Sequence, residues 1–152
     1  MIRLSQEHLQ IIRTHAESTY PDECCGIILG YLANEGKTVV EVIPTENAWN
    51  TEAASEFPGE RTTESKRRQY AIAPEVMLKT QKQARERSLN IIGIIHSHPD
   101  HPAIPSECDR LYAWQGYSYI IVSVQNGKAG ELKSWSLDDH YQFQAEEIKN
   151  IK

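Results

Sequence analysis

The feature that most constrains the fold is the segment NIIGIIHSH at residues 90–98, an apolar run of strand length that ends at Pro99. Isoleucine favours strands, and a proline cannot donate to a continuing ladder of hydrogen bonds. A second apolar run, YSYIIVSVQ at residues 117–125, is separated from ELKSWSLD at residues 131–138 by the glycine turn NGKAG. Because such runs divided by a turn are typical of neighbouring strands, these segments predict a sheet.

Two helices are expected where apolar residues recur at helical spacing. The first begins at Ser5, a good N-cap, and ends at Pro21. The second covers residues 74–88 and starts with a proline, which a first helical turn tolerates; it stops near Asn90. The residues expected on their buried sides are Leu9, Ile12 and Ala16 in the first helix and Met77, Leu78 and Ala84 in the second.

The remaining segments complete a mixed fold. CCGIILGYLA and KTVVEVIPT flank NEGK, which predicts a hairpin with a glycine-containing turn. Residues 48–69 are polar without a steady period and predict a long mobile loop, whereas residues 140–151 are expected to form a closing helix. Strands interleaved with helices predict a mixed sheet flanked by helices, an α/β or α+β domain.

Composition narrows the class of protein. At 152 residues the chain fits one domain over residues 1–152, and its 39% apolar and 24% charged residues are typical of soluble globular proteins. The net charge of −5 argues against a nucleic-acid partner, because phosphate binding needs a concentrated basic face. The basic cluster Lys66, Arg67 and Arg68 is expected to be solvated surface.

Membrane and disulfide signals are both missing from the sequence. No apolar stretch reaches the roughly 18 residues that a membrane span needs, and the first residues, MIRLSQEHLQ, lack the apolar centre of a signal peptide. Three cysteines, two of them adjacent at Cys24 and Cys25, do not predict a disulfide framework. We therefore expect a cytoplasmic protein with reduced thiols and no membrane partner.

Polar residues converge at the end of the first predicted strand. Because side chains alternate along a strand, His96 and His98 are expected on one face and Ser97 on the other. Three prolines then stiffen a loop, and Ser106 is a good N-cap for a short helix through SECDRLYAW. Asp109 falls in the first turn of that helix.

These residues allow two interpretations. Two histidines and a carboxylate leave one position of a tetrahedral zinc site open, which is the catalytic arrangement. However, a lone H-x-H on a strand commonly binds no metal, and a Ser followed by an acid three residues later is also a helix capping box.

The whole arrangement H-x-H-x7-S-x2-D, from His96 through Ser106 to Asp109, resembles the JAMM signature of the MPN+ zinc metalloproteases. PDECCG at residues 21–26 is similar to the P-x-E-x-C-G element of that family, and its carboxylate falls on Glu23. Most of the chain looks like the small bacterial stand-alone members. The resemblance implies the MPN/JAMM fold, a cytidine-deaminase-like architecture with a curved, mostly antiparallel sheet.

The resemblance also implies roles for individual residues. His96, His98 and Asp109 would be the ligands of one zinc ion per chain. Glu23 would be the general base and acid, taking a proton from water and returning it to the leaving amine. Ser106 would hydrogen-bond the oxyanion of the tetrahedral intermediate.

The implied activity is that of a zinc metallopeptidase or isopeptidase that hydrolyses an amide bond. Small bacterial members act on ubiquitin-like sulfur-carrier proteins, for example releasing a cysteine attached after a C-terminal Gly-Gly. A deubiquitinase-like isopeptidase is one alternative, because the loop at residues 48–69 is longer than in compact members. A non-catalytic MPN scaffold is the other, although scaffold members typically lack a metal ligand and none is missing here.

Other polar residues are expected to be bystanders. Cys25 is expected to pack as a small apolar residue, and thiolate coordination or redox control by Cys24, Cys25 or Cys108 is the less favoured alternative. His101 is expected to be solvated, with substrate contact as its alternative. The tryptophans expected to pack in the core or at its edge are Trp49, Trp114 and Trp135.

Overall fold

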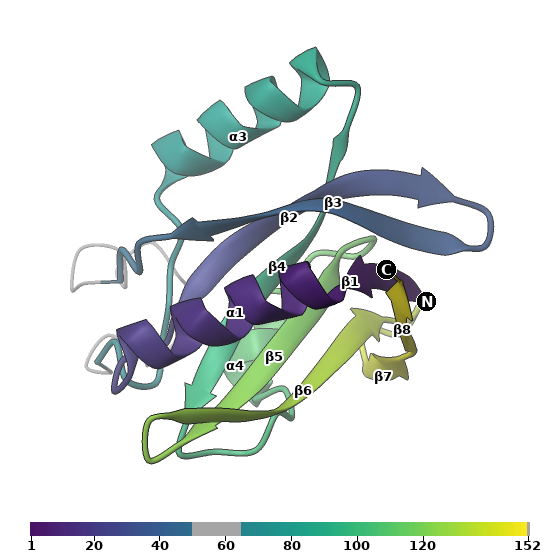
Figure 1. Ribbon diagram of the computed structural model, residues 1–152. Coiled ribbons are helices and arrows are strands. Elements are labelled where there is room, and N and C mark those ends of the chain that lie inside the picture. Colours follow the sequence, from purple (N-terminus) through teal and green to yellow (C-terminus); the bar gives the residue numbers. More distant parts are fainter. Residues whose placement is uncertain (50–64, 152) are drawn as a thin grey trace.

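One mixed sheet of eight strands organises the part of the chain that the structure describes (Figure 1). The structure is a computed structural model, and it describes residues 1–49 and 65–151. The strands are β1 (Ile2–Ser5), β2 (Cys25–Ala33), β3 (Gly36–Thr45), β4 (Asn90–Pro99), β5 (Ser118–Gln125), β6 (Lys128–Leu137), β7 (Phe143–Glu146) and β8 (Ile148–Ile151). Their order across the sheet is β7-β6-β5-β4-β2-β3-β1-β8. The pairs β1·β3, β1·β8 and β4·β5 are parallel and the others antiparallel, which confirms the predicted fold class.

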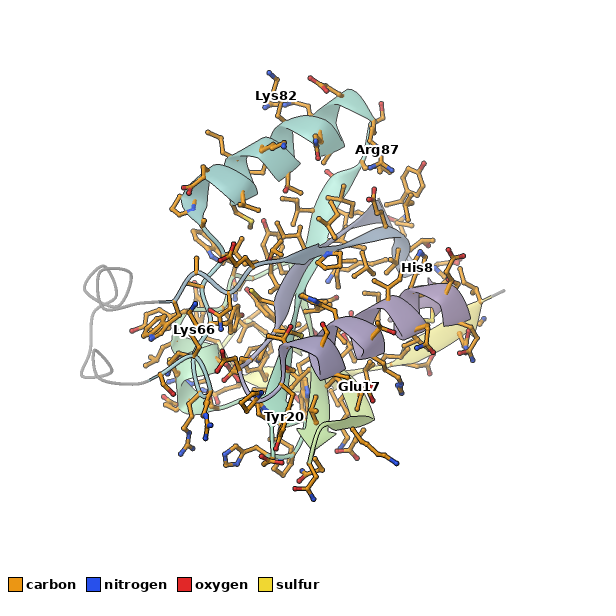
Figure 2. All side chains as sticks on the ribbon, turned by 60° about the vertical axis from the view of Figure 1, so that its left-hand side comes forward. His8, Glu17, Tyr20, Lys66, Lys82 and Arg87 are labelled. Atoms are coloured by element: carbon orange, nitrogen blue, oxygen red, sulfur yellow. The ribbon has the colours of Figure 1, made fainter. Side chains whose placement is uncertain are left out.

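Helices α1 (Gln6–Thr19) and α3 (Pro74–Glu86) lie on opposite sides of the sheet, and α4 (Glu107–Leu111) is a short helix (Figure 1). The start of α1 is fixed by a capping box, because Ser5 Oγ accepts from the His8 amide at 3.2 Å and His8 Nδ1 accepts from the Ser5 amide at 3.1 Å. Helix α3 carries Lys82 on the side away from the sheet (Figure 2). None of the described helices is long and apolar enough to cross a membrane.

Each face of the sheet has its own hydrophobic core. Alternation along β2 sends Ile28 to the core under α1, and Ile27 to the core under α3. A shift of register between β2 and β4 leaves Ile92 on the α1 side and Ile94 on the α3 side. The alternation that follows Ile94 decides which way the polar residues at the end of β4 point.

Helix α3 differs from its prediction on one face. Met77 and Ala84 pack on the core as expected, but Leu78 is 67% exposed. Successive helix residues are separated by about 100°, so Leu78 is turned away from the stripe that contains Met77. Thr80 occupies the buried place instead.

The predicted closing helix at residues 140–151 is wrong. Residues 143–146 form β7 beside β6, and residues 148–151 form β8 beside β1. These two strands lie at opposite edges of the sheet although only Glu147 separates them, so the curved sheet brings its edges together. The backbone groups of the tail pair with the free backbone groups of β1 and β6 at the two sheet edges. This pairing outweighs the local preference of the tail for a helix.

Two of the three tryptophans pack as predicted. Trp49 is buried, and Trp135 donates its indole N–H to the Ala103 carbonyl at 3.1 Å. Trp114 is 70% exposed, which corrects the prediction for that residue.

The long loop predicted at residues 48–69 lies mostly outside the described residues. Its two described ends are joined, because the Ala48 amide donates to the Ala71 carbonyl at 2.8 Å.

Candidate metal centre

His96 and His98 point to the same face of β4, as the alternation predicts. Both side chains follow Ile94 onto the α3 side of the sheet, and their ring centroids are 5.1 Å apart. Ser97 faces the other way, where its Oγ accepts a hydrogen bond from the Cys24 amide at 2.7 Å. The end of β4 therefore presents two imidazoles together and uses the residue between them to hold a neighbouring segment.

Asp109 reaches these histidines from the first turn of α4. Ser106 Oγ accepts from the Asp109 amide at 3.0 Å, and Asp109 Oδ2 accepts from the Ser106 amide at 2.8 Å, which is a complete capping box. The same Oδ2 lies 3.1 Å from His98 Nε2 and 3.4 Å from His96 Nε2. Asp109 can therefore cap the helix and bind a metal ion at the same time, since its Oδ2 contacts both the Ser106 amide and the histidines.

The hydrogen-bond partners of the His98 ring indicate whether a cation fits between His98 and Asp109. Its Nδ1 lies 2.8 Å from the Pro102 carbonyl oxygen, which can only accept, so Nδ1 carries a hydrogen. In a neutral ring Nε2 then directs a lone pair at Asp109 Oδ2, and two lone pairs repel unless a proton or a metal ion lies between them. A ring hydrogen bond to a backbone carbonyl is also the usual support of a metal-ligating histidine.

His96 is buried and held by stacking. The Tyr70 ring lies against it, with centroids 4.6 Å apart and planes inclined by 21°. Within residues 1–49 and 65–151 neither ring nitrogen of His96 makes a hydrogen bond. Burial lowers the pKa of His96, although Asp109 opposes this, and so favours the neutral ring that metals bind.

The carboxylate of Asp109 is held ionised. Burial alone would raise its pKa, but the nearby imidazoles, first His96 and then His98, bring it well below its usual range. A buried carboxylate beside two imidazoles provides a donor set of two nitrogens and one oxygen, which suits zinc.

Glu23 approaches the histidines from the segment just before β2. It is 5% exposed, and it can offer a carboxylate oxygen within 4.8 Å of ligand atoms from both His96 and His98. Its amide donates to the Lys66 carbonyl at 2.8 Å. The four residues that the sequence singled out as ligands and proton carrier are therefore brought together by β4, α4 and the start of β2.

Asn47 fixes the backbone of Glu23, a role that the sequence did not reveal. Its buried amide donates to the carbonyls of Glu23 at 2.9 Å and Gln69 at 3.0 Å. Its Oδ1 accepts from the amides of Trp49 at 3.0 Å and Ala71 at 3.3 Å. Because all four bonds go to main chain on three segments, nothing local in the sequence could have indicated them.

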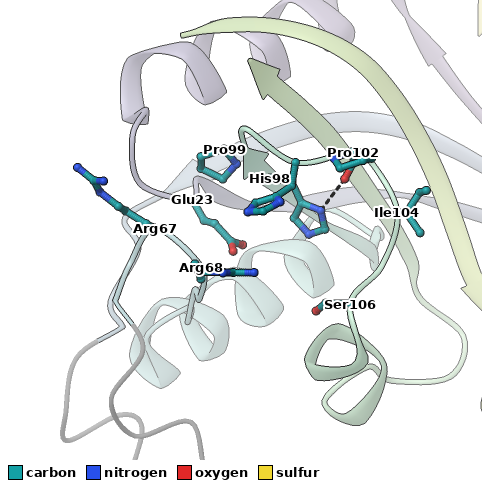
Figure 3. A pocket seen from close by; sticks show the side chains of 9 residues that line it. Glu23, Arg67, Arg68, His98, Pro99, Pro102, Ile104 and Ser106 are labelled. Atoms are coloured by element: carbon teal, nitrogen blue, oxygen red, sulfur yellow. Dashed lines mark hydrogen bonds between the residues drawn. The ribbon is translucent and has the colours of Figure 1, made fainter. Parts of the chain in front are cut away.

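A cavity of about 210 Å³ opens on the exposed side of these residues (Figure 3). Prolines and Ile104 form part of its wall, and Ser106 lies at its rim. Arg67 and Arg68, expected as plain solvated surface, line this cavity together with Glu23. Three consecutive basic residues in an acidic chain were the signal that could have pointed to them. His101 lines the same cavity although it is exposed.

The cysteines do not take part as thiolates. All three are free and buried. Burial raises the pKa of Cys24 to about 12 and that of Cys25 to about 11, so both are neutral thiols at neutral pH. Cys108 donates its thiol hydrogen to Gln69 Oε1 at 3.3 Å.

Comparison with known proteins finds relatives with similar sequences. A family model described as prokaryotic homologs of the JAB domain matches residues 5–138. A desampylase of Pyrococcus furiosus is 34% identical over 73 residues, which cover 47% of this chain and 49% of the relative. A desampylase of Haloferax volcanii is 30% identical over 112 residues, which cover 73% of this chain and 69% of the relative. The chain thus matches about half of the first relative and about two thirds of the second. Their names support an enzyme of the hydrolase class.

Solved structures agree on the fold. The solution structure of a protein from Desulfitobacterium hafniense superposes with a TM-score of 0.79 at 25% identity, covering 100% of this chain and 94% of the other. A crystal structure of a JAB1/MPN domain protein from Archaeoglobus fulgidus gives a TM-score of 0.60 at 19% identity and covers 100% of both chains. Since the family model spans most of the sequence and the fold agrees with it, this chain belongs to the prokaryotic JAB family of JAMM/MPN proteins.

Proposed function

We propose that this protein is a zinc metallopeptidase that hydrolyses the amide bond after the C-terminal Gly-Gly of a ubiquitin-like or sulfur-carrier protein. An adduct of such a carrier with cysteine is the favoured substrate. The observation that carries the proposal is the position of Asp109 Oδ2, 3.1 Å from His98 Nε2 and 3.4 Å from His96 Nε2. With the hydrogen of His98 on Nδ1, this arrangement needs a proton or a metal ion between Nε2 and the carboxylate, and the donor set suits zinc.

His96, His98 and Asp109 would hold the zinc ion through Nε2, Nε2 and Oδ2. When bound, zinc supplies Lewis acidity, which lowers the pKa of water and polarises a carbonyl group. Tyr70 and the Pro102 carbonyl orient the two rings from outside. Stacking and hydrogen bonding of this kind maintain the geometry that a metal requires.

Glu23 and Ser106 would move the proton and bind the developing charge. The Glu23 carboxylate takes a proton from the attacking water and returns it to the nitrogen of the leaving amine as the C–N bond breaks. Ser106 Oγ already accepts from the Asp109 amide, so its own hydrogen can be donated to the oxyanion.

The similarity to two desampylases supports a ubiquitin-like partner. An extended Gly-Gly tail suits a narrow site, because glycine lets the backbone approach closely. A deubiquitinase-like isopeptidase is the second candidate, since the long segment at residues 48–69 falls where substrate-contacting insertions are expected. A scaffold without activity is disfavoured because the residues expected to bind metal and to carry the proton lie close together.

The decisive experiment uses a sulfur-carrier protein with cysteine attached after Gly-Gly, incubated with the zinc-loaded protein and analysed by mass spectrometry. The Glu23→Gln variant should retain one zinc ion per chain and lose hydrolysis by about 10²- to 10⁴-fold, the usual contribution of a general acid–base group. The matched control is Asp22→Asn, a neighbouring carboxylate that does not line the cavity. A Glu23→Gln variant as fast as the wild type would overturn the role of Glu23.

Substrate class is decided in the same assay. Cleavage of ubiquitin chains without cleavage of the carrier adduct would favour the deubiquitinase-like alternative. Zinc binding without cleavage of either would favour a scaffold.

A further inference from the structure

The proposed reaction determines which side of the cavity beside Glu23 faces the leaving group. In the proposed function, Glu23 gives its proton to the nitrogen of the leaving group, so the leaving group must lie on the Glu23 side of the scissile bond. Residues that share a wall with Glu23 therefore face the leaving group. Arg67 and Arg68 both border this cavity, but only a side chain that points into it can meet the leaving group.

Of the two arginines, Arg68 is placed to meet a ligand. In Figure 3 the Arg68 side chain points toward the cavity that Glu23 also lines, whereas the Arg67 side chain extends away from it. Across the described ranges 1–49 and 65–151, the Arg68 guanidinium makes no hydrogen bond or ion pair. Arg67 lies instead toward Asp100, whose pKa is lowered mainly by a hydrogen bond from the Asn126 amide and, to a smaller extent, by the charge of Arg67.

The cavity suits a small anion. Beside Arg68 the wall combines apolar residues, Pro99, Pro102 and Ile104, with the polar side chains of His101 and Ser106. A guanidinium matches a carboxylate with two parallel hydrogen bonds, which an imidazole or a hydroxyl cannot offer. At about 210 Å³ the cavity is smaller than the roughly 300–1,000 Å³ typical of sites for drug-sized ligands, so a leaving group of the size of one amino acid suits it.

We propose that Arg68 binds the free α-carboxylate of the leaving group, so that the enzyme releases a single C-terminal amino acid. This inference rests on the proposed function for the role of Glu23. Water adds its oxygen to the carrier carbonyl, the C–N bond breaks, the proton passes through Glu23 to the amine, and the freed amino acid keeps the carboxylate it had. Arg68 thus selects a free C-terminus against an isopeptide-linked protein.

The test compares two substrates and two variants of the zinc-loaded protein. The substrates are a carrier ending in Gly-Gly-Ala with a free carboxylate and the same carrier ending in a carboxamide. Wild-type kcat/KM should be about 10- to 100-fold higher for the free acid, the range expected for hydrogen bonds to a charged group. Arg68→Gln should remove this preference by slowing only the free acid, chiefly through KM.

Arg67→Gln is the matched control because it removes the same charge from the neighbouring residue. It should leave the preference for the free acid within about threefold of wild type. Equal cleavage of acid and carboxamide by the wild type would overturn the inference and leave the proposed function standing. Equal losses in both arginine variants would also overturn it, because they would indicate general attraction by positive charge.

A binding experiment separates this inference from the activity. Titration of the zinc-loaded protein with L-alanine and with L-alaninamide, followed by NMR, should show tighter binding of L-alanine. That difference should shrink about tenfold or more in Arg68→Gln and persist in Arg67→Gln. If the cysteine adduct and both Gly-Gly-Ala substrates are left uncleaved, the proposed function fails, and this titration still decides whether Arg68 binds a carboxylate.

Discussion

The ring of Tyr70 stacks on the ring of His96, with centroids 4.6 Å apart and planes inclined by 21°. This contact holds the face of the buried imidazole, and within the described residues neither ring nitrogen of His96 makes a hydrogen bond. We predict that Tyr70→Ala weakens zinc binding about 10- to 100-fold, the range found for partners outside the ligand shell. Tyr70→Phe should bind zinc like the wild type, because stacking does not need the hydroxyl. Chelator competition measures both, and equal loss in the two variants would contradict the stacking role.

Asn47 is predicted to position Glu23 without touching substrate. Asn47→Asp keeps the acceptor for the amides of Trp49 and Ala71 but loses both donors, including the one to the Glu23 carbonyl. Leaving such buried groups unsatisfied costs about 1–3 kcal/mol each. Turnover should fall at unchanged zinc content, and the free energy of unfolding should fall with it. The exposed Asn150→Ala is the control.

A double-mutant comparison distinguishes positioning from simple destabilisation. In a Glu23→Gln background, Asn47→Asp should slow turnover no further, because it acts through the carboxylate that is already lost. A full additional loss of rate would show that Asn47 acts elsewhere.

Ser106 is predicted to have two separable roles. Ser106→Ala should lower the free energy of unfolding by about 1 kcal/mol, the usual cost of a lost N-cap, and weaken zinc binding because one of the two hydrogen bonds that hold Asp109 is lost. Ser106→Asn should restore the cap and the zinc affinity but not the rate, since the hydroxyl that serves the oxyanion is missing. Full activity in Ser106→Asn would remove the oxyanion role.

The buried thiols predict an alkaline limit to stability. Burial raises the pKa of Cys24 from 9.0 to about 12. Because the folded pKa is the higher one, the stabilising contribution is complete below pH 9 and is lost as the pH rises toward about 12. The free energy of unfolding should therefore decline over this interval, and Cys24→Ala should reduce the decline. Urea titrations at several pH values measure it, with the exposed Ser18→Ala as control.

Sequence reasoning succeeded where the pattern is local. Residues that are two positions apart on a strand lie on the same face, so the sequence alone predicts that His96 and His98 point the same way. A serine three residues before an acid predicts a capping box, which placed Ser106 and Asp109 correctly. Glu23 was found only through the family motif, because no spacing links it to the end of β4.

Sequence reasoning failed where partners come from distant parts of the chain. The four bonds of Asn47 go to backbone groups that any residue would offer, so composition cannot reveal them. Arg68 is exposed, as expected of the basic cluster, but its place in the cavity wall depends on Glu23 and His98, which are distant in the sequence. Residues 140–151 became strands because two open sheet edges supplied partners, and those edges are set by β1 and β6.

The pairing of β1 with β8 forms late during synthesis, after the other strands of the sheet have been made. Residues 2–5 are made before the other strands described here, yet their outer partner is residues 148–151, which are made after those strands. Contacts so distant in sequence are slow to form, since a long loop must close before they contribute. The candidate metal centre can assemble on β2, β4 and α4 before then, so the nascent chain would hold its residues together inside a sheet that still has both edges open.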